Sequence, residues 1–268
     1  MVKMKLRFVA LALVLANLLF APMSQAQAYQ AGLCAVPVTS AGFKTCESGA
    51  DVPKFNVALI GDSHTRSWFG PTKDLALKYQ WKLTVISKSA CPPLNPSNMP
   101  SHLPSPTCLE WNQRLQSYLS DHPAFDLIIN MSSSFVTQGS PTYASSFAWA
   151  IQQMAKAGSH VIVIKDNPKP SSGFLACIAA NPKNADTACA RAKVAALQPI
   201  DPMPSAVVGY KNVQVADFTD SYCSATVCSP VIAGITVYRD HSHISAPWAL
   251  HMQNRLDSII PAKFKITG

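Results

Sequence analysis

The sequence predicts an α/β fold, a three-layer αβα sandwich in which a five-stranded, mainly parallel sheet lies between two layers of helices. Short apolar runs rich in β-forming residues alternate with longer helix-compatible segments, which is the pattern of repeated βα units. Hydrophobic residues make up 48% of the 268 positions and charged residues 13%, which excludes a disordered or coiled-coil chain. The chain is long enough to bury one sizeable core, and it contains no linker that would separate two domains.

Five apolar runs are the expected strands, and five further segments are the expected helices. The strands are residues 55–60, 82–86, 126–130, 160–165 and 213–217. The helices are residues 72–79, 109–119, 143–157, 185–197 and about 245–260. Gly158 stands where a helix is expected to end, directly before the fourth strand.

Two longer stretches interrupt this alternation. Residues 92–106 contain six prolines and are expected to form an irregular excursion. Residues 167–204 follow the fourth strand and contain two cysteines. Because both stretches follow the carboxyl end of a strand, the edge at which open α/β sheets bind ligands, we expect the functional site there.

Residues 1–28 have the pattern of a secretory signal peptide. Three basic residues precede an apolar run at 8–20, and small side chains allow cleavage after Ala26 or Ala28. The run is shorter than the roughly 20 apolar residues of a transmembrane helix, which disfavours the alternative of an uncleaved anchor. We therefore expect residues 29–268 to form a single periplasmic or secreted domain that keeps no membrane span after processing.

All eight cysteines follow the signal segment, and an even number in that context indicates disulfides. They fall into four local pairs along the chain. The expected bridges are Cys34–Cys46, Cys91–Cys108, Cys177–Cys189 and Cys223–Cys228. Structural zinc is the weaker alternative, because no CxxC occurs and the histidines do not interleave with the cysteines. Leu33 is too bulky to precede a lipoprotein cysteine at Cys34.

The charge balance disfavours nucleic acid as a partner. The chain has 22 Lys and Arg against 14 Asp and Glu, a formal charge of +8, and three of the positive charges lie in the signal segment. The basic residues are scattered, and none of them form a run interleaved with aromatic residues. The remaining positive charge is compatible with mild attraction to an anionic envelope polymer.

The strongest local signal is Gly61-Asp62-Ser63-His64, directly after the first expected strand. A tight strand-to-helix turn directs a serine hydroxyl into a crevice and leaves the serine N–H free to bind an oxyanion. Gly61 would permit such a turn, and Asp62 would hold it by accepting hydrogen bonds from nearby N–H groups. An ordinary Gly-Asp-Ser turn that caps a helix is the alternative interpretation.

A second signal lies in residues 238–245, just before the last expected helix. Asp240 and His243 are three residues apart, so the carboxylate can orient a histidine that removes the proton of a serine. His241 is a rival base, but it adjoins Asp240 too closely for the usual pairing. A surface histidine pair and a metal site at His241 and His243 are the alternatives. The metal is disfavoured because the chain offers no obvious further ligands.

Together these two stretches resemble the SGNH hydrolase superfamily, and more narrowly the SGNH domain that many bacterial membrane acyltransferases carry at their C-terminus. Further pieces occur in the order typical of that domain. They are the run Ser89 to Pro93, Cys108 with Trp111 three residues later, and the late pair Cys223 and Cys228. The resemblance extends over about residues 55–260 and implies a flavodoxin-like αβα sandwich.

The resemblance implies roles for individual residues. Ser63 would be the nucleophile, His243 the general base and then the acid, and Asp240 the residue that orients His243. Ser63 would attack an ester, form an acyl-serine and pass the acyl group to water or to a sugar hydroxyl. No cofactor and no metal are implied. We expect a packing or hydrogen-bonding role for His64, which adjoins the nucleophile.

The sequence departs from the superfamily pattern after the second and third strands. The superfamily usually has a Gly after the second strand and Gly-x-Asn-Asp after the third, which complete the oxyanion hole. In this sequence Ala90 stands at the position of the Gly after the second strand, and its backbone N–H is an equivalent donor. Ser134, or a neighbouring serine, is expected to replace the missing Asn. The expected oxyanion donors are therefore Ser63, Ala90 and Ser134.

The expected function is that of an O-acyl transferase or esterase, with O-acetyl the expected case, that acts on an envelope or exported polysaccharide through an acyl-serine intermediate. The partners implied are an acyl donor, a glycan acceptor and a separate membrane acyltransferase that supplies the acyl group. A carbohydrate acetylesterase or a small lipase-like enzyme is one alternative, and a carbohydrate-binding module without useful catalysis is another. Tryptophans are expected in the core or at its rim, although Trp68 or Phe69 could line the pocket.

Overall fold

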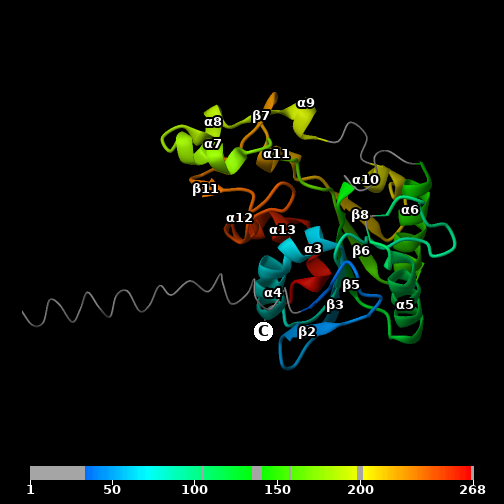
Figure 1. The fold of residues 1–268 in the computed structure, drawn as a ribbon. Helices are drawn as coiled ribbons and strands as arrows, with labels where there is room; N and C mark the ends of the chain where they lie inside the picture. Colours follow the sequence, from blue (N-terminus) through cyan, green and yellow to red (C-terminus); the bar gives the residue numbers. More distant parts are fainter. Residues whose placement is uncertain (1–33, 104, 135–140, 157, 198–201, 267–268) are drawn as a thin grey trace, which may run out of the picture.

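The structure is a computed structural model that describes residues 34–103, 105–134, 141–156, 158–197 and 202–266 (Figure 1). The expected signal peptide lies outside the described residues. Among the residues that are described, no helix combines the length and the apolar character needed to cross a bilayer.

The described residues form a central sheet of seven strands. Six run parallel to their neighbours: β1 (Ala35–Val36), β3 (Phe55–Gly61), β4 (Trp81–Lys88), β5 (Leu127–Met131), β6 (His160–Ile164) and β8 (Val213–Ala216). Their order across the sheet is β1-β4-β3-β5-β6-β8. The seventh strand, β2 (Cys46–Gly49), pairs antiparallel with β4.

The predicted fold class is confirmed, because the five expected strands are β3, β4, β5, β6 and β8 in a parallel sheet. Strands β1 and β2 extend the sheet beyond β4. With 2 and 4 residues, they are too short to produce a recognisable pattern of alternating hydrophobic residues, so the sequence did not indicate them.

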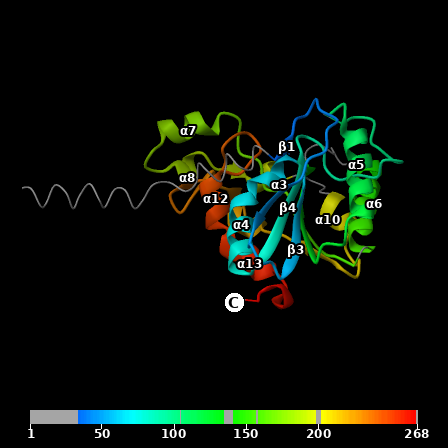
Figure 2. The ribbon, with the colours of Figure 1, turned by 90° about the horizontal axis from the view of Figure 1, so that it is seen from below.

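Helices cover both faces of the sheet (Figure 2). The first face is covered by α4 (Phe69–Lys78), α12 (Ala246–His251) and α13 (Gln253–Ile259). The second face is covered by α5 (Cys108–Asp121), α6 (Pro141–Lys156) and α10 (Pro202–Ala206). Successive side chains of β3 alternate between the two cores, so Leu59 packs on the first face and Ile60 on the second.

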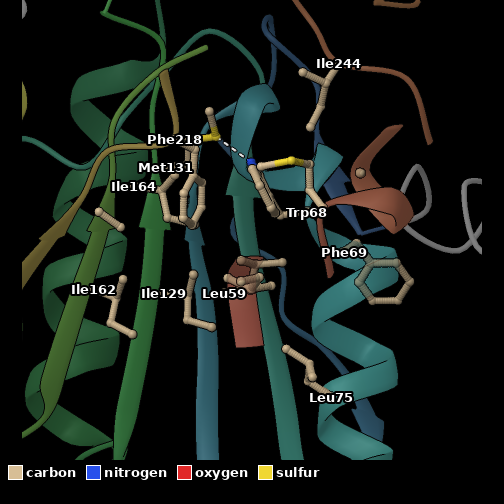
Figure 3. Packing of buried hydrophobic residues seen from close by; sticks show 14 of the residues in the cluster. Leu59, Trp68, Phe69, Leu75, Ile129, Met131, Ile162, Ile164, Phe218 and Ile244 are labelled. Atoms are coloured by element: carbon tan, nitrogen blue, oxygen red, sulfur yellow. Dashed lines mark hydrogen bonds between the residues drawn. The ribbon is translucent and has the colours of Figure 1, made fainter. Parts of the chain in front are cut away.

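The core on the first face is shown in Figure 3. Leu59, Ile129 and Ile162 project from three neighbouring strands toward the helix side, where Phe69 and Leu75 of α4 pack. All five side chains are nearly inaccessible to solvent. This apolar layer fixes α4, and with it the short segment that joins β3 to α4, against the sheet.

Two of the expected helices are interrupted. The segment predicted as a helix at 185–197 consists of α8 (Ala185–Ala188), β7 (Arg191–Ala192) and α9 (Lys193–Ala196). Strand β7 pairs with β9 (Val227–Cys228), and a disulfide holds Cys189, so long-range constraints override the local preference for helix. The last expected helix is divided at Met252 into α12 and α13.

The remaining elements are short. The helix α3 (Ser63–Ser67) begins at the strand-to-helix turn that the sequence indicated. The sequence did not indicate the others, which are α7 (Phe174–Ala180), α11 (Thr219–Tyr222), β10 (Val231–Ile232), β11 (Ile235–Thr236) and the 3₁₀ helix η2 (Ala262–Phe264). Helices α7 and α8 lie on the same side of the sheet as α12 (Figures 1 and 2).

The four expected disulfides are all present, and the described residues contain no free cysteine. The Cys91–Cys108 bridge joins the end of β4 to the start of α5 and so closes the proline-rich excursion at its base. Both of its cysteines are fully buried. The bridge therefore restricts a long loop next to the edge of the sheet where β4 ends.

Removing the Cys91–Cys108 bridge by replacing both cysteines with alanine is expected to lower the free energy of unfolding by about 2–4 kcal/mol, because the unfolded chain gains the freedom of the opened loop. Urea denaturation measures this. The matched control is the same double replacement at Cys223 and Cys228, which are 5 residues apart rather than 17, so the loss should be smaller. Free thiols at Cys91 and Cys108 in the untreated protein would contradict the prediction.

Candidate active site

The candidate site begins where β3 turns into α3. Asp62 is the N-cap of α3, and its Oδ1 accepts a hydrogen bond of 2.8 Å from the backbone N–H of His64. Ser63 is therefore the first residue of the helix, and its side chain is only partly buried. A β-carbon at Gly61 would collide with Thr65 Oγ1 and with the carbonyl oxygen of Met131, so this position requires glycine because of close packing.

The buried Asp62 carboxylate also ties the turn to the end of β5. Its Oδ2 accepts a hydrogen bond of 2.8 Å from the N–H of Ser133. Thr65 adds a second tie, because its hydroxyl contacts the backbone of Met131. Burial raises the pKa of Asp62, although His64 and the two N–H donors act to lower it. The position of Ser63 is thus fixed by contacts to a strand that lies far away in the sequence.

The three residues predicted from the two sequence signals lie in one chain of hydrogen bonds. His243 Nε2 is 2.8 Å from Ser63 Oγ, and His243 Nδ1 is 2.9 Å from both carboxylate oxygens of Asp240. Asp240 Oδ1 also accepts the backbone N–H groups of Ser242 and His243, at 3.0 and 2.8 Å. These local bonds fold the loop so that the imidazole points at the serine.

The electrostatics of this chain keep the carboxylate charged and the imidazole neutral. Burial acts to raise the pKa of Asp240, but the N–H groups of His243 and Ser242 outweigh it and hold this pKa well below its usual range. Burial is the main cause that lowers the pKa of His243, and the positive charge of His64 is the second. Together they lower this pKa to about 4, although Asp240 acts to raise it. At neutral pH, His243 can therefore accept a proton from Ser63.

A second histidine–carboxylate pair lies behind His243, and the sequence reasoning missed its acid. His64 Nδ1 is 2.7 Å from Asp166 Oδ1, and both side chains are at most 3% exposed. Burial acts to lower the pKa of His64, but Asp166 and then Asp62 outweigh it and raise this pKa to about 9. The His64 ring centroid is 4.7 Å from that of His243, so a buried positive charge lies against the predicted base.

Asp166 and its neighbour Asn167 organise the loops around the site. Asp166 Oδ2 accepts the backbone N–H of Ser134 at 2.9 Å and its hydroxyl at 3.1 Å. Asn167 Nδ2 donates to the carbonyl of Ser242 at 2.8 Å and so holds the loop that carries His243. The signal in the sequence was the position of these two polar residues just past the carboxyl end of β6, separated from it only by Lys165.

The predicted oxyanion donors differ in their availability. Neither the N–H of Ser63 nor that of Ala90 donates a hydrogen bond to any described part of the chain. Ala90 has a φ of +53°, a left-handed conformation that favours glycine, which is the residue that the superfamily usually has there. The N–H and the hydroxyl of Ser134 are both engaged by Asp166. The place of Ser134 in an oxyanion hole stays a prediction.

Other residues singled out in the sequence lie outside the site. Trp68 and Phe69 do not line an open pocket, because they are 0% and 4% exposed and belong to the core of the first face. The Trp68 indole N–H instead lies 2.7 Å from Met131 Sδ (Figure 3). His241 is exposed. Within the described ranges, no group of three or more His, Cys, Asp and Glu side chains is arranged to hold a metal ion.

Comparisons with known proteins agree with the observed fold. A family model described as the SGNH domain fused to AT3 domains matches residues 33–258. Among curated proteins there is no significant match. Among solved structures, the periplasmic domain of a lipopolysaccharide acetyltransferase from Salmonella ser. Paratyphi A is similar, with a TM-score of 0.59 and 13% identity. The alignment covers 78% of this chain and 84% of that domain, so the two share a fold.

Proposed function

The chain belongs to the family of SGNH domains that occur fused to AT3 domains, and on that premise we propose that it is a serine-dependent O-acyltransferase that modifies an envelope or exported polysaccharide. The observation that carries the proposal is the chain of hydrogen bonds from Ser63 through His243 to Asp240. The oxygen, the base and the orienting carboxylate lie in the order that nucleophilic acyl transfer requires.

In the first half of the reaction, Ser63 Oγ attacks the carbonyl carbon of the acyl donor while its proton passes to His243 Nε2. The tetrahedral intermediate carries its negative charge on the former carbonyl oxygen. The free N–H groups of Ser63 and Ala90 are the proposed donors to that oxygen, because both are available in the described chain. The ester bond then breaks, the leaving alcohol takes the proton from His243, and an acyl-serine remains.

In the second half, a sugar hydroxyl of the acceptor gives its proton to His243 Nε2 and attacks the acyl-serine. Collapse of the second tetrahedral intermediate forms the new sugar ester, and Ser63 Oγ regains its proton from His243. Asp240 holds the imidazole in the tautomer that carries its proton on Nδ1 and stabilises the imidazolium that forms in each half.

The proposed location is the periplasm or the cell exterior. Four disulfides among the described residues support an oxidising compartment, and the similar Salmonella structure is described as a periplasmic domain. The family is defined by SGNH domains fused to AT3 domains, so a membrane acyltransferase is the proposed source of the acyl group. No cofactor takes part in the proposed reaction.

Intact-protein mass spectrometry after brief incubation with 4-nitrophenyl acetate tests the proposal. The expected result is a single acetyl adduct that maps to Ser63 and disappears faster when a glycan acceptor is added, with acetylated sugar as the product. If the acetyl adduct decayed at the same rate whether or not an acceptor was present, for every acceptor tried, the protein would be a hydrolase instead. Absence of both an adduct and nitrophenol release would contradict catalysis by this site.

The charge on His64 is expected to control the acid limit of activity. His243 is faced by Asp240, His64 and Arg239, and its pKa of about 4 keeps it a neutral base at mildly acidic pH. Replacing His64 with Gln removes a positive charge and leaves the Asp166 carboxylate without its cationic partner, so the pKa of His243 should rise. Activity then requires a higher pH, and kcat/KM at pH 5 relative to pH 8 should fall.

A profile of kcat/KM between pH 4 and pH 8 measures this shift. The matched control is replacement of His102, an exposed histidine in the proline-rich excursion, with Gln, which should leave the profile unchanged. Asp62 and Lys169 also face His64 and remain present in both variants. An acid limb at the same pH in the wild type and in His64→Gln would show that the buried pair has no influence on the base.

A further inference from the structure

Two arginines flank the proposed catalytic side chains. Arg66 lies three residues after Ser63 in α3, so the two side chains share a face of the helix. Its two terminal guanidinium nitrogens each lie 3.3 Å from Ser89 Oγ, next to the proposed oxyanion donor at Ala90. Arg239 lies beside the orienting carboxylate, with its Nε 3.4 Å from Asp240 Oδ2. One arginine thus adjoins the nucleophile and the other adjoins Asp240.

Arg66 is a partly buried cation that forms no ion pair with any described carboxylate. The Ser89 hydroxyl is a neutral partner at long distance. Burial lowers the pKa of Arg66, and the nearby charge of Arg239 lowers it further. Arg255, by contrast, pairs with the Asp220 carboxylate on the surface at 2.8 Å. The charge of Asp62 acts on the pKa of Arg66 in the opposite direction, but that carboxylate forms no ion pair with the guanidinium. A ligand that supplied a paired anion would therefore stabilise this partly buried cation.

The carboxylates near the site are already engaged. Both oxygens of Asp62 accept backbone N–H groups, and Asp166 pairs with His64. Asp240 accepts hydrogen bonds from the His243 ring and from two backbone N–H groups. Its contact with Arg239 involves only the Nε atom of that side chain. The outer guanidinium nitrogens of Arg239 form no ion pair with a described carboxylate, and its side chain is 53% exposed. Arg66 and the outer nitrogens of Arg239 therefore remain available to an anion beside Ser63 and Asp240.

We propose that Arg66 and Arg239 form a subsite for an anionic group of the substrate, a carboxylate or a phosphate, next to Ser63. The planar, multidentate guanidinium group matches both oxyanions and binds them more strongly than a neutral hydroxyl. The inference rests on the proposed function, because it specifies that a substrate of the proposed acyl transfer carries a negative charge. The anion has two possible sources: a second carboxylate on the acyl group, or an acidic sugar of the acceptor.

The donor source is tested by comparing two 4-nitrophenyl esters of similar size, the pentanoate and the half-ester of succinate, with the rate of Ser63→Ala subtracted as background. The acceptor source is tested by comparing methyl glucoside and methyl glucuronide as acceptors of the acetyl group. Each arm gives a ratio of kcat/KM for the anionic over the neutral compound. Arg66→Gln, Arg66→Lys and Arg239→Gln are measured beside the control Arg255→Gln, which removes an arginine that is paired with Asp220 on the surface.

The wild type is expected to favour the anionic compound in one of the two arms. That ratio should fall about tenfold or more in Arg66→Gln and in Arg239→Gln, the scale of one lost charged hydrogen bond, whereas Arg255→Gln should keep it. Arg66→Lys should recover only part of it, because an ammonium group lacks the fork of the guanidinium. Ratios that stay the same in both Gln variants, or a wild type that favours the neutral compound in both arms, would overturn the subsite.

Calorimetric titration of the protein with succinate and with methyl glucuronide separates this inference from the proposed function. Binding of either anion that is lost in Arg66→Gln supports the subsite even if no ester is turned over, in which case only the acyltransferase proposal fails. Turnover of neutral esters without binding of either anion and without an anionic preference would overturn the subsite and leave the proposed function standing.

Discussion

Replacing Ser63 with alanine is expected to lower kcat for 4-nitrophenyl acetate by about 10⁶-fold, the scale of the loss when the nucleophile of a serine triad is removed. The replacement deletes the one oxygen that His243 Nε2 contacts and leaves no covalent route for the acyl group. Because Ser63 is only partly buried and its backbone carries the helix start, the fold should be retained. Steady-state kinetics measure the loss, and thermal denaturation checks the fold.

The matched control is Ser67→Ala, a replacement of the same type in the same short helix. The Ser67 hydroxyl has no hydrogen-bond partner in the described chain, so its loss should leave turnover within about twofold and stability within about 0.5 kcal/mol. If Ser63→Ala kept more than about a tenth of wild-type turnover, the proposed nucleophile would be wrong. Persistence of the acetyl adduct in that variant would point to another acceptor side chain.

Replacing Asp240 with asparagine is expected to lower kcat by about 10³-fold to 10⁴-fold. Asparagine keeps the size of the side chain, and its oxygen can still accept the backbone N–H groups of Ser242 and His243. It lacks the negative charge that orients the Nδ1 proton and stabilises the imidazolium. The loop should therefore stay folded while His243 loses its efficiency as a base.

The control for this variant is Asp220→Asn, which removes an exposed carboxylate paired with Arg255 and should leave kcat unchanged. The double variant Ser63→Ala with Asp240→Asn gives a further check. If the two residues act as one unit, the second change adds almost nothing to the loss caused by the first. Losses that multiply in the double variant would mean that Asp240 acts on something other than the Ser63–His243 pair.

Much of the architecture could be read from local patterns. Strands β3, β5 and β6 contain nearly continuous apolar runs, because parallel strands are covered by helices on both faces. Such runs are visible without any knowledge of the partner strands. The four disulfides join cysteines that are near one another in the chain, with separations from 5 to 17 residues. The nucleophile turn and the Asp240–His243 loop are likewise built from a few consecutive residues.

Features that depend on contacts between distant segments could not be predicted in this way. Residues 185–197 have helical composition, but a disulfide and a strand pairing from residues 227–228 break them into pieces. Trp68 follows the nucleophile in sequence, yet the direction of α3 turns it into the core. In both cases, long-range packing outweighs the preference of the segment itself.

The sequence alone determined the fold class, the bridges and the two short stretches that carry Ser63, Asp240 and His243, because each depends on the spacing of nearby residues. Only the tertiary structure brought Ser63 Oγ within 2.8 Å of His243 Nε2, although the two residues are 180 positions apart in the sequence. Only the tertiary structure placed the His64–Asp166 pair and the two arginines beside them. The charges at the site arise from side chains on the short helix α3 and on separate loops. Their interaction energies depend on distance and burial, which exist only once the sheet has assembled.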